Sequence, residues 1–212
     1  PYCRVKFALM SKIPVSVLII AQNAAAFLPR CLASLNDFDE VVVIDGGSTD
    51  QSPKIYQEYP NVVVYHNPWP GFIEQRNFSL KKAKHPWCLM LDTDEAVTPK
   101  LIEEVNNVLA DPKPAVMYKI VRTEYLEGLA IESGFGASDY QERLFQRDRV
   151  TYGGGVHHIH LIDGKEIPHQ SPLVRSLPRE ARIDHWPAFS MDDWLRKFPR
   201  FVSLVAHEKM KS

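Results

Sequence analysis

The chain has 212 residues, a length that fits one sizeable hydrophobic core, or one domain with a short appendage. Hydrophobic residues make up 45% and charged residues 24%, as in ordinary globular proteins, and the formal net charge of −1 excludes a global attraction to nucleic acid or anionic membrane. The cysteines Cys3, Cys31 and Cys88 are widely spaced and odd in number, which favours reduced thiols in the cytoplasm over a disulfide framework.

The start of the chain carries no targeting signal that we recognise. The apolar run at 15–21 is far shorter than the roughly 18 residues that span a bilayer. We expect residues 1–9 to be a remnant that lies outside the fold, because the Met-Ser-Lys at 10–12 resembles a natural start.

Residues 15–116 alternate between strand and helix patterns. Short apolar, β-branched runs at 15–21, 40–45, 61–66 and 87–91 predict strands buried on both faces. Helices are predicted for the segments between these strands: 27–35, the segment from the Ser-Thr-Asp at 48–50 to about 59, and 72–84. A further helix is predicted after Pro99. This alternation predicts an α/β fold with a mainly parallel sheet flanked by helices.

The second half has a different character. Apolar runs at 115–126 and 141–150 predict two further strands, and the glycine-rich residues after them predict loops and short strands in an antiparallel or mixed extension of the sheet. Ser190 and Asp193 form a capping box that begins an amphipathic C-terminal helix over 189–212, which Pro199 should kink or split. Its basic and aromatic residues fit either packing on the sheet or contact with an anionic membrane.

Carboxylates crowd the end of the predicted strand at 87–91, in the stretch "WCLMLDTDE". Asp92 and Asp94 point to the same side of an extended segment, where they repel each other unless a cation lies between them. A divalent ion such as Mg²⁺ or Mn²⁺ would resolve the conflict. The alternative is a helix start, since Asp and Glu suit the first turn of the helix that follows.

Polar residues also follow two other predicted strands. Gln22 and Asn23 come after the first, and Asp45 ends the second, so together with Asp92 and Asp94 they would share one edge of a parallel sheet. The "DGGSTD" at 45–50 lacks both the dinucleotide and the P-loop spacing, and its Ser48 and Thr49 are expected to cap the next helix. A carboxylate at a buried strand end needs a hydrogen-bond partner, and a nucleobase N–H would serve Asp45.

The motifs resemble those of the family 2 glycosyltransferases, which have the GT-A (Rossmann-like) fold, and more narrowly the bacterial branch that adds hexoses to the lipopolysaccharide inner core. The segments that carry the resemblance are "SVLIIAQN", "CLASL", "EVVVIDGGSTDQS", "NPWPGFIEQRNFSL", "WCLMLDTDE", "RLFQRD" and "YGGGVHH". The resemblance implies a GT-A domain over 10–188, with a nucleotide-sugar half at about 14–110 and an acceptor half at about 111–188.

The resemblance also implies a donor site. Asp45 would bind the uracil of a UDP-sugar, and Gln22 and Asn23 would line the same base pocket. Arg76 and Asn77 would approach the nucleotide or its pyrophosphate, because a guanidinium matches phosphate oxygens.

The carboxylates at 92–94 match the DXD motif of the family. The resemblance makes Asp92 and Asp94 the metal-binding and nucleotide-binding residues, with Asp94 the direct ligand to Mn²⁺ or Mg²⁺. His185 would complete the metal shell. The alternative for His185 is a packed, hydrogen-bonded histidine beside Trp186.

An inverting transfer needs a base on the acceptor side, within hydrogen-bond reach of the attacking hydroxyl. The candidates are Asp139, Glu142, His157, His158 and Asp163. His158 stands where the resembled branch carries a glutamate, and a histidine can act as a base. A zinc site made of His157, His158 and His160 is disfavoured, because neighbouring residues of a strand alternate sides.

The resemblance therefore implies a metal-dependent, inverting hexosyltransferase that moves glucose from UDP-glucose to a lipopolysaccharide core or related glycan acceptor. It would work in the cytoplasm, with possible peripheral contact with the inner membrane and no nucleic acid partner. The alternatives are a protein or peptide glycosyltransferase of the same fold, a nucleotidyltransferase, and a pseudoenzyme that binds nucleotide sugars without turnover.

Overall fold

The computed structural model of the chain describes residues 11–131, 139–154, 158–168, 170–188, 190–193 and 195–196. Four parallel strands begin the fold: β1 (Ile13–Ala21), β2 (Phe38–Asp45), β3 (Val62–His66) and β4 (Trp87–Leu91). They alternate with helices α1 (Leu28–Ala33), α2 (Ser52–Tyr56) and α3 (Phe72–Lys82). The predicted alternation is confirmed, although α1 and α2 are shorter than expected.

The second half contains one long helix and mostly short strands. Its elements are β5 (Glu95–Val97), α4 (Pro99–Ala110), β6 (Met117–Leu126), β7 (Leu129–Ala130), β8 (Asp139–Gln146), the 3₁₀ turn η1 (Arg147–Arg149), β9 (Val150–Gly154), β10 (His158–Ile162), β11 (Lys165–Glu166), β12 (Val174–Ser176) and β13 (Arg182–His185).

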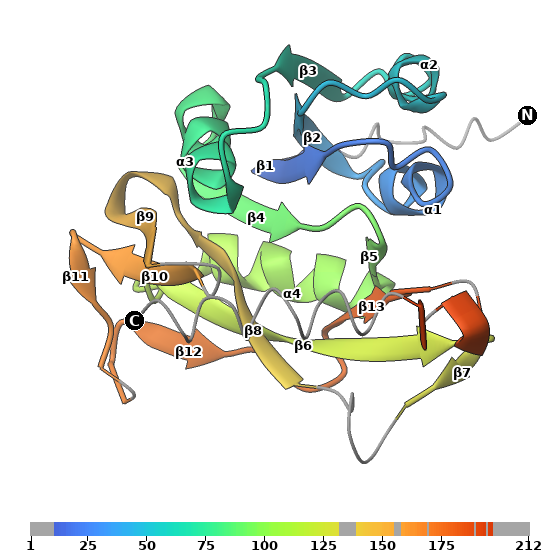
Figure 1. Cartoon of the computed structure of the whole chain (residues 1–212). Coiled ribbons are helices and arrows are strands. Elements are labelled where there is room, and N and C mark those ends of the chain that lie inside the picture. Colours follow the sequence, from blue (N-terminus) through green and yellow to red (C-terminus); the bar gives the residue numbers. More distant parts are fainter. Residues whose placement is uncertain are drawn as a thin grey trace, which may run out of the picture.

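One ten-stranded sheet runs through both halves, in the order β3-β2-β1-β4-β8-β6-β13-β5, with β7 and β12 also pairing with β6 (Figure 1). Strand β8 is antiparallel to both β4 and β6, so it joins the parallel half to a mixed half. Strands β9, β10 and β11 form a separate antiparallel sheet. The predicted mixed extension is therefore confirmed.

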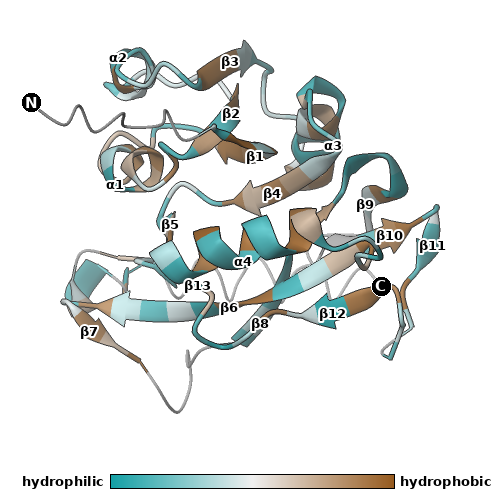
Figure 2. Cartoon of the chain, turned by 180° about the vertical axis from the view of Figure 1, so that it is seen from behind, coloured by the Kyte–Doolittle hydropathy of each residue, from teal (hydrophilic) through white to brown (hydrophobic). Residues whose placement is uncertain are grey.

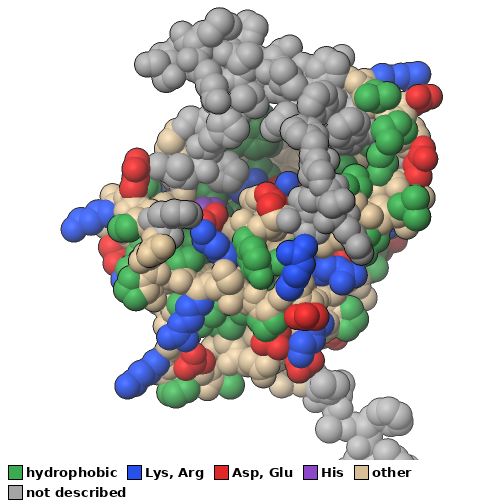
Figure 3. Space-filling model, turned by 90° about the horizontal axis from the view of Figure 1, so that it is seen from below, with side chains coloured by type: hydrophobic (Ala, Val, Ile, Leu, Met, Phe, Trp, Pro, Cys, Tyr) green, Lys and Arg blue, Asp and Glu red, His purple; other side chains and the backbone are tan. Residues whose placement is uncertain are grey.

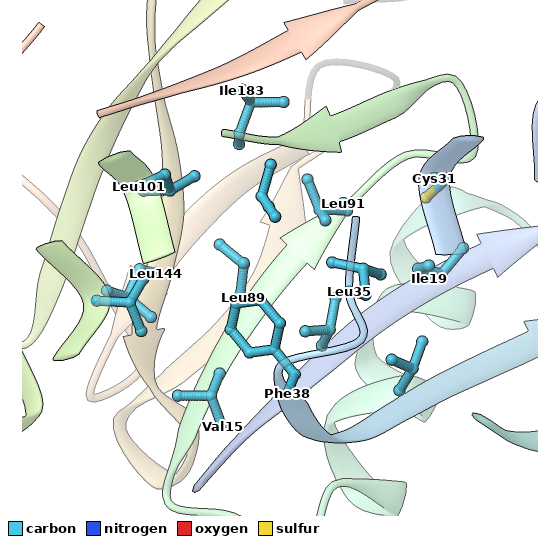
Figure 4. Close-up of a cluster of buried hydrophobic side chains, with 14 of the residues drawn as sticks. Val15, Ile19, Cys31, Leu35, Phe38, Leu89, Leu91, Leu101, Leu144 and Ile183 are labelled. Carbon is cyan, nitrogen blue, oxygen red and sulfur yellow. The ribbon is translucent and has the colours of Figure 1, made fainter. Parts of the chain in front are cut away.

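Each face of the sheet has its own hydrophobic layer. Helices α1, α2 and α4 cover one face, where Phe38, Leu89 and Leu101 belong to one buried cluster (Figure 4). Helix α3, β9 and β10 cover the other face over Leu18 and Met90. Bands of hydrophobic and hydrophilic residues alternate along α4, as expected for a helix with one buried side (Figure 2).

Two expectations are corrected. The predicted strand at 141–150 is divided: β8 ends at Gln146, and the Val150 N–H donates to the Arg147 carbonyl oxygen to close the turn η1 before β9 begins. The helix-start alternative for the carboxylates at 92–95 is wrong. Thr98 caps α4 through a hydrogen bond from the Leu101 N–H, and Glu95 begins a strand.

The end of the chain is only partly described. The Asp193 N–H donates to Ser190 Oγ (3.1 Å), as the predicted cap requires, and residues 191–193 are helical. The rest of the predicted helix over 189–212, Pro199 included, lies outside the described residues apart from 195–196, as does the expected remnant at 1–9. Within the described part, none of the helices combines the length and apolar character needed to cross a membrane.

Replacing Leu89 by Ala should destabilise the fold by about 2–5 kcal/mol, because Leu89 is fully buried in the central strand β4 and its truncation leaves a cavity. Equilibrium unfolding in urea measures the change. Val63→Ala is the control, since Val63 is 42% exposed on the edge strand β3, and it should change the free energy of unfolding far less. Equal effects of the two substitutions would contradict this account of the core.

Candidate active site

The polar strand ends lie side by side at one edge of the sheet. In the order β2-β1-β4, Ala21 pairs with Asp45, and Ile19 pairs with Leu91. Asp92 follows β4 directly, so the predicted grouping of these strand ends at the carboxyl edge of parallel strands is present.

Asp45 shapes the turn that follows β2. Its Oδ1 accepts the N–H groups of Gly47 (2.8 Å) and Ser48 (2.7 Å), and its Oδ2 accepts the Tyr56 hydroxyl (3.0 Å). Burial works to raise the pKa of Asp45, but the bonds from Ser48, Gly47 and Tyr56 outweigh it, so the pKa is lowered. The side chain is 1% exposed, so these internal donors satisfy the buried carboxylate, and its contact with a base stays a prediction.

Gln22 and Asn23 tie the loop after β1 to the loop after β2. Gln22 Nε2 donates to the Gly46 carbonyl oxygen (3.1 Å). Asn23 adopts a left-handed backbone (φ 51°), donates its N–H to Ser48 Oγ (2.9 Å) and accepts the Thr49 N–H (2.8 Å). The expectation that Ser48 and Thr49 cap the next helix is therefore wrong. Helix α2 begins only at Ser52, with Gln51 at its N-cap position and no side-chain cap, while Ser48 and Thr49 bond to Asn23 instead.

Two arginines hold Asp92. Arg76 Nη2 lies 3.1 Å from Asp92 Oδ1, and Arg143 Nη2 lies 3.3 Å from Asp92 Oδ2. The same Arg143 Nη2 donates to Glu95 Oε1 (2.6 Å), and Glu95 Oε2 accepts the Asp92 N–H (2.9 Å). The negative charges of Asp92 and Glu95 are therefore balanced by guanidinium groups from α3 and β8.

The electrostatic consequences differ between the two acids. Burial works to raise the pKa of Asp92, but the charges of Arg143 and Arg76 outweigh it and hold that pKa well below its usual range. Burial raises the pKa of Glu95 to about 7 in spite of Arg143, because Glu95 is 1% exposed and lies beside Asp92. Asp92 is thus the acid that stays ionised, and its side chain is one-third exposed to solvent.

A β-bulge aims Arg143 at this cluster. Tyr118 pairs with Leu144 while the next residue, Lys119, pairs with Glu142, which leaves Arg143 as the extra residue of β8. Bulges of this kind redirect a side chain and occur often beside active sites. Neither Arg143 nor Glu95 had a site role predicted from the sequence, although Glu95 ends the crowded "WCLMLDTDE" and Arg143, the first residue of "RLFQRD", is a charge within an otherwise strand-like run.

His185 lies next to Asp94. Strand β13 runs between β6 and β5 and places His185 Nε2 3.3 Å from Asp94 Oδ2, while Nδ1 lies 2.7 Å from Glu124 Oε2. Burial works to lower the pKa of His185, but the hydrogen bonds to Asp94 and Glu124 outweigh it and raise the pKa to about 10. Glu124 in turn is paired with Arg122 (3.1 Å), so the cluster extends along β6.

These groups can hold a divalent ion that shares its shell with phosphates once His185 gives up the proton that its raised pKa otherwise retains. Within the ranges that the structure describes, no group of three or more His, Cys, Asp or Glu side chains could hold a metal alone. Asp94 and His185 still present an oxygen and a nitrogen side by side, and Mg²⁺-type sites often use one or two protein carboxylates together with substrate phosphates. Both oxygens of Asp92 face arginines, so Asp94 is the better direct ligand.

The candidate bases fall in different places. Asp139 is 53% exposed and lies at the edge of the charged cluster, with Oδ1 3.9 Å from Arg122 Nε. Glu142 pairs with Lys119 (3.2 Å), and Asp163 pairs with Arg149 on the separate small sheet. His157 and the side chain of His158 lie outside the described residues.

Two other predicted residues have packing partners. Asn77 joins α3 to β9, since its side chain donates to the Tyr152 carbonyl oxygen (2.8 Å) and accepts the Tyr152 N–H (2.9 Å). His160, from the disfavoured zinc cluster, packs against the rings of Tyr152 and Phe145. A nucleotide contact by Asn77 stays a prediction.

A cavity of about 230 Å³ adjoins Asp94 and Glu95, between α1 and the end of β13. The Arg30 guanidinium lies 4.1 Å from the centre of the Trp186 ring at this cavity. A larger open cleft, about 680 Å³, lies between α3 and β9. None of the strand-end carboxylates lines it, so we do not assign the active site to this cleft. Seen from below, acidic, basic and histidine side chains gather around a recess in the surface (Figure 3).

The chain is similar in sequence to several known proteins. Residues 16–163 match the family described as glycosyl transferase family 2. The chain is 27% identical over 215 residues to the lipopolysaccharide core biosynthesis glycosyltransferase LpsC of Rhizobium meliloti. That alignment covers 96% of this chain and 74% of LpsC. It is 34% identical over 97 residues to an uncharacterized glycosyltransferase of Rickettsia bellii. That alignment covers 45% of this chain and 33% of the Rickettsia protein.

The fold is shared with a solved structure. Staphylococcus aureus TarS 1-349 in complex with UDP-GlcNAc superimposes with a TM-score of 0.55 at 15% identity, over 83% of this chain and 59% of that chain. This likeness shows the fold, which is that of the GT-A glycosyltransferases, and the expected fold class is thereby confirmed. The chain spans about three-quarters of LpsC and less than two-thirds of the other two proteins.

Replacing Arg143 by Met should destabilise the protein by about 3–5 kcal/mol, because the change keeps much of the side-chain volume but removes the close cation of Glu95 and one of the two cations of Asp92. Urea unfolding measures the loss. The double variant Arg143→Met/Glu95→Gln should recover part of it, since the second change removes one unpaired charge. A single variant as stable as the wild type would show that Arg143 does not compensate this cluster.

Proposed function

The chain belongs to glycosyl transferase family 2, and we propose that it is a metal-dependent, inverting hexosyltransferase that uses a UDP-sugar, with UDP-glucose as the donor. The observation that supports this proposal most directly is the pairing of Asp94 with His185 beside an Asp92 held by two arginines. An ionised carboxylate, a second ligand and guanidinium groups at one strand edge suit a diphosphate and its metal ion.

The donor would lie across the carboxyl edge of β2, β1 and β4. Its diphosphate would lie at the β4 end, near Asp94 and His185, and its base would reach the turn after β2. An ion bound there would neutralise charge that develops on the departing UDP. Arg76 and Arg143 would keep Asp92 ionised and oriented, and the UDP-GlcNAc complex of TarS supports a UDP-sugar as the donor class.

The transfer itself joins an acceptor hydroxyl oxygen to the anomeric carbon while the bond from that carbon to the UDP oxygen breaks. The hydroxyl proton passes to a base on the acceptor side. Among the described candidates, Asp139 is the one at the edge of the charged cluster, where its own partners are Arg122 (3.9 Å) and the Gln141 side-chain amide (2.6 Å). Glu142 and Asp163 are engaged by Lys119 and Arg149, and His158 remains a further candidate from the sequence.

A glycan of the lipopolysaccharide core or a related glycolipid is the acceptor we propose, on the basis of the similarity to LpsC. Such an acceptor would bring the protein to the cytoplasmic face of the inner membrane, as a peripheral partner of that membrane. Glycosylation of a protein or peptide would use the same donor half, so acceptor assays must include both classes.

Release of UDP from UDP-glucose should require Mn²⁺ or Mg²⁺. Asp94→Asn should lower the metal-dependent rate by at least about 100-fold, because losing a direct ligand should cost no less than losing an outer-shell partner of the ligands. A coupled UDP assay, with and without a chelator and with added glycan acceptors, measures this. Asp111→Asn is the control, because Asp111 lies at the end of α4 and pairs with Arg175, away from the strand edge.

The outcomes separate the alternatives. UDP-glucose binding without any UDP release, even with acceptors present, would favour a pseudoenzyme. A rate that chelation and Asp94→Asn leave unchanged would contradict the metal-dependent mechanism.

A further inference from the structure

Trp69 lies in the loop between β3 and α3, within the sequence "NPWPGF". It is 38% exposed, and its neighbour Phe72 is 49% exposed. The two rings make an edge-to-face contact with centroids 4.9 Å apart. Single exposed apolar side chains are common on this surface, but two exposed aromatic rings in contact form a contiguous apolar patch, and such patches often mark binding sites.

The loop that carries Trp69 is fixed at both ends. The Asn67 N–H donates to the Asp45 carbonyl oxygen (3.0 Å), and the side chain of Gln75, itself fully buried, exchanges hydrogen bonds with the backbone and side chain of Asn67. Gly71 ends the loop with φ 136°, which L-residues rarely adopt.

The prolines add to this rigidity. Pro68 and Pro70 each restrict φ, and Pro70 holds Trp69 itself in an extended conformation. The backbone that carries the indole is therefore restricted before a ligand binds, which lowers the entropy cost of ordering this loop.

The ring lies against the turn after β2. A Cβ atom added to Gly46 would be 3.2 Å from Trp69 Cε3 and 3.6 Å from Gln22 Cβ, so the glycine allows the indole to approach the turn closely. Gly46 is adjacent to Asp45, and its carbonyl oxygen accepts the Gln22 side-chain amide. Trp69 thus belongs to the same strand edge as the predicted base pocket.

The spacing of the strands matches a nucleotide. The end of β2 is separated from the end of β4 only by β1, which is two strand spacings, or about 10 Å. A nucleoside diphosphate whose phosphates lie beside Asp94 is long enough to bring its base to the turn at Gly46. The loop with Trp69 follows β3, the next strand outward, and lies over that turn.

We propose that Trp69 is the stacking surface for the nucleobase of the donor nucleotide, an inference that rests on the function proposed above. Flat bases stack well on indole rings, and stacking contributes affinity with little selectivity between bases. Selectivity for uracil would then fall to the polar groups of the turn. Trp69 would contact the base end of the donor and leave the diphosphate end unaffected.

The test is equilibrium binding of UDP, UMP and pyrophosphate, each with Mn²⁺, to the wild type, Trp69→Ala and Trp69→Phe. Trp69→Ala should weaken UDP and UMP binding by the same factor, about 10- to 100-fold, and leave pyrophosphate binding unchanged. Trp69→Phe should recover most of the affinity. Leu173→Ala is the matched control, because Leu173 is 37% exposed and lies before β12, outside this edge.

Fluorescence gives a second measure that does not depend on the stability of the alanine variant. UDP should change the tryptophan emission of the wild type, and most of this change should be absent in Trp69→Phe, although three other tryptophans remain. A full UDP-induced change in Trp69→Phe would overturn the proposal.

Binding separates the two proposals. Equal or tighter UDP binding by Trp69→Ala would overturn the stacking role while leaving the donor class intact, and an equal loss of pyrophosphate binding would overturn a role confined to the base. If the wild type binds pyrophosphate with Mn²⁺ but neither UDP nor UMP, the proposed donor is wrong, and the stacking role is overturned with it.

Discussion

The contact of the Arg143 guanidinium with Asp92 and Glu95 is the interaction on which the site depends. The chain places these carboxylates at the end of a fully buried strand, where like charges without a cation would oppose folding. Arg143 comes from the antiparallel strand β8, so the same contact that neutralises the strand end also joins the parallel half of the sheet to the mixed half. Arg76 completes the arrangement from α3 and holds the other oxygen of Asp92.

With Asp92 held in this way, the remaining polar groups of the strand edge lie in two separate places. Asp94 faces His185, which β13 delivers from far along the chain, and this pair is the part of the site suited to an ion and its phosphates. The turn at Asp45 is closed by its own hydrogen bonds and lies under Trp69, which suits the base end of a nucleotide. The strand edge therefore has a charged end and a flat, apolar end, about as far apart as the two ends of a nucleoside diphosphate.

Much of this could be predicted from local pattern. Continuous β-branched runs between amphipathic segments identify the parallel strands, because both faces of such strands are buried. The polar residues after β1, β2 and β4 could be assigned to one edge, since parallel strands end on the same side. One error concerns residues whose hydrogen-bond partner lies far away along the chain. Ser48 and Thr49 have the composition of a helix cap, yet Asn23 from another loop takes both of them.

By itself, the sequence determined the alternation of strands and helices, the acidic end of β4 and the membership of a glycosyltransferase family, because each depends on residues close together in the chain. Only the tertiary structure decided which cation compensates Asp92, which acid faces His185, and which surface Trp69 covers. A β-bulge at Arg143 and the position of β13 between β6 and β5 decide the first two. These contacts depend on strand pairing and register between distant segments, which hydrophobic periodicity leaves open.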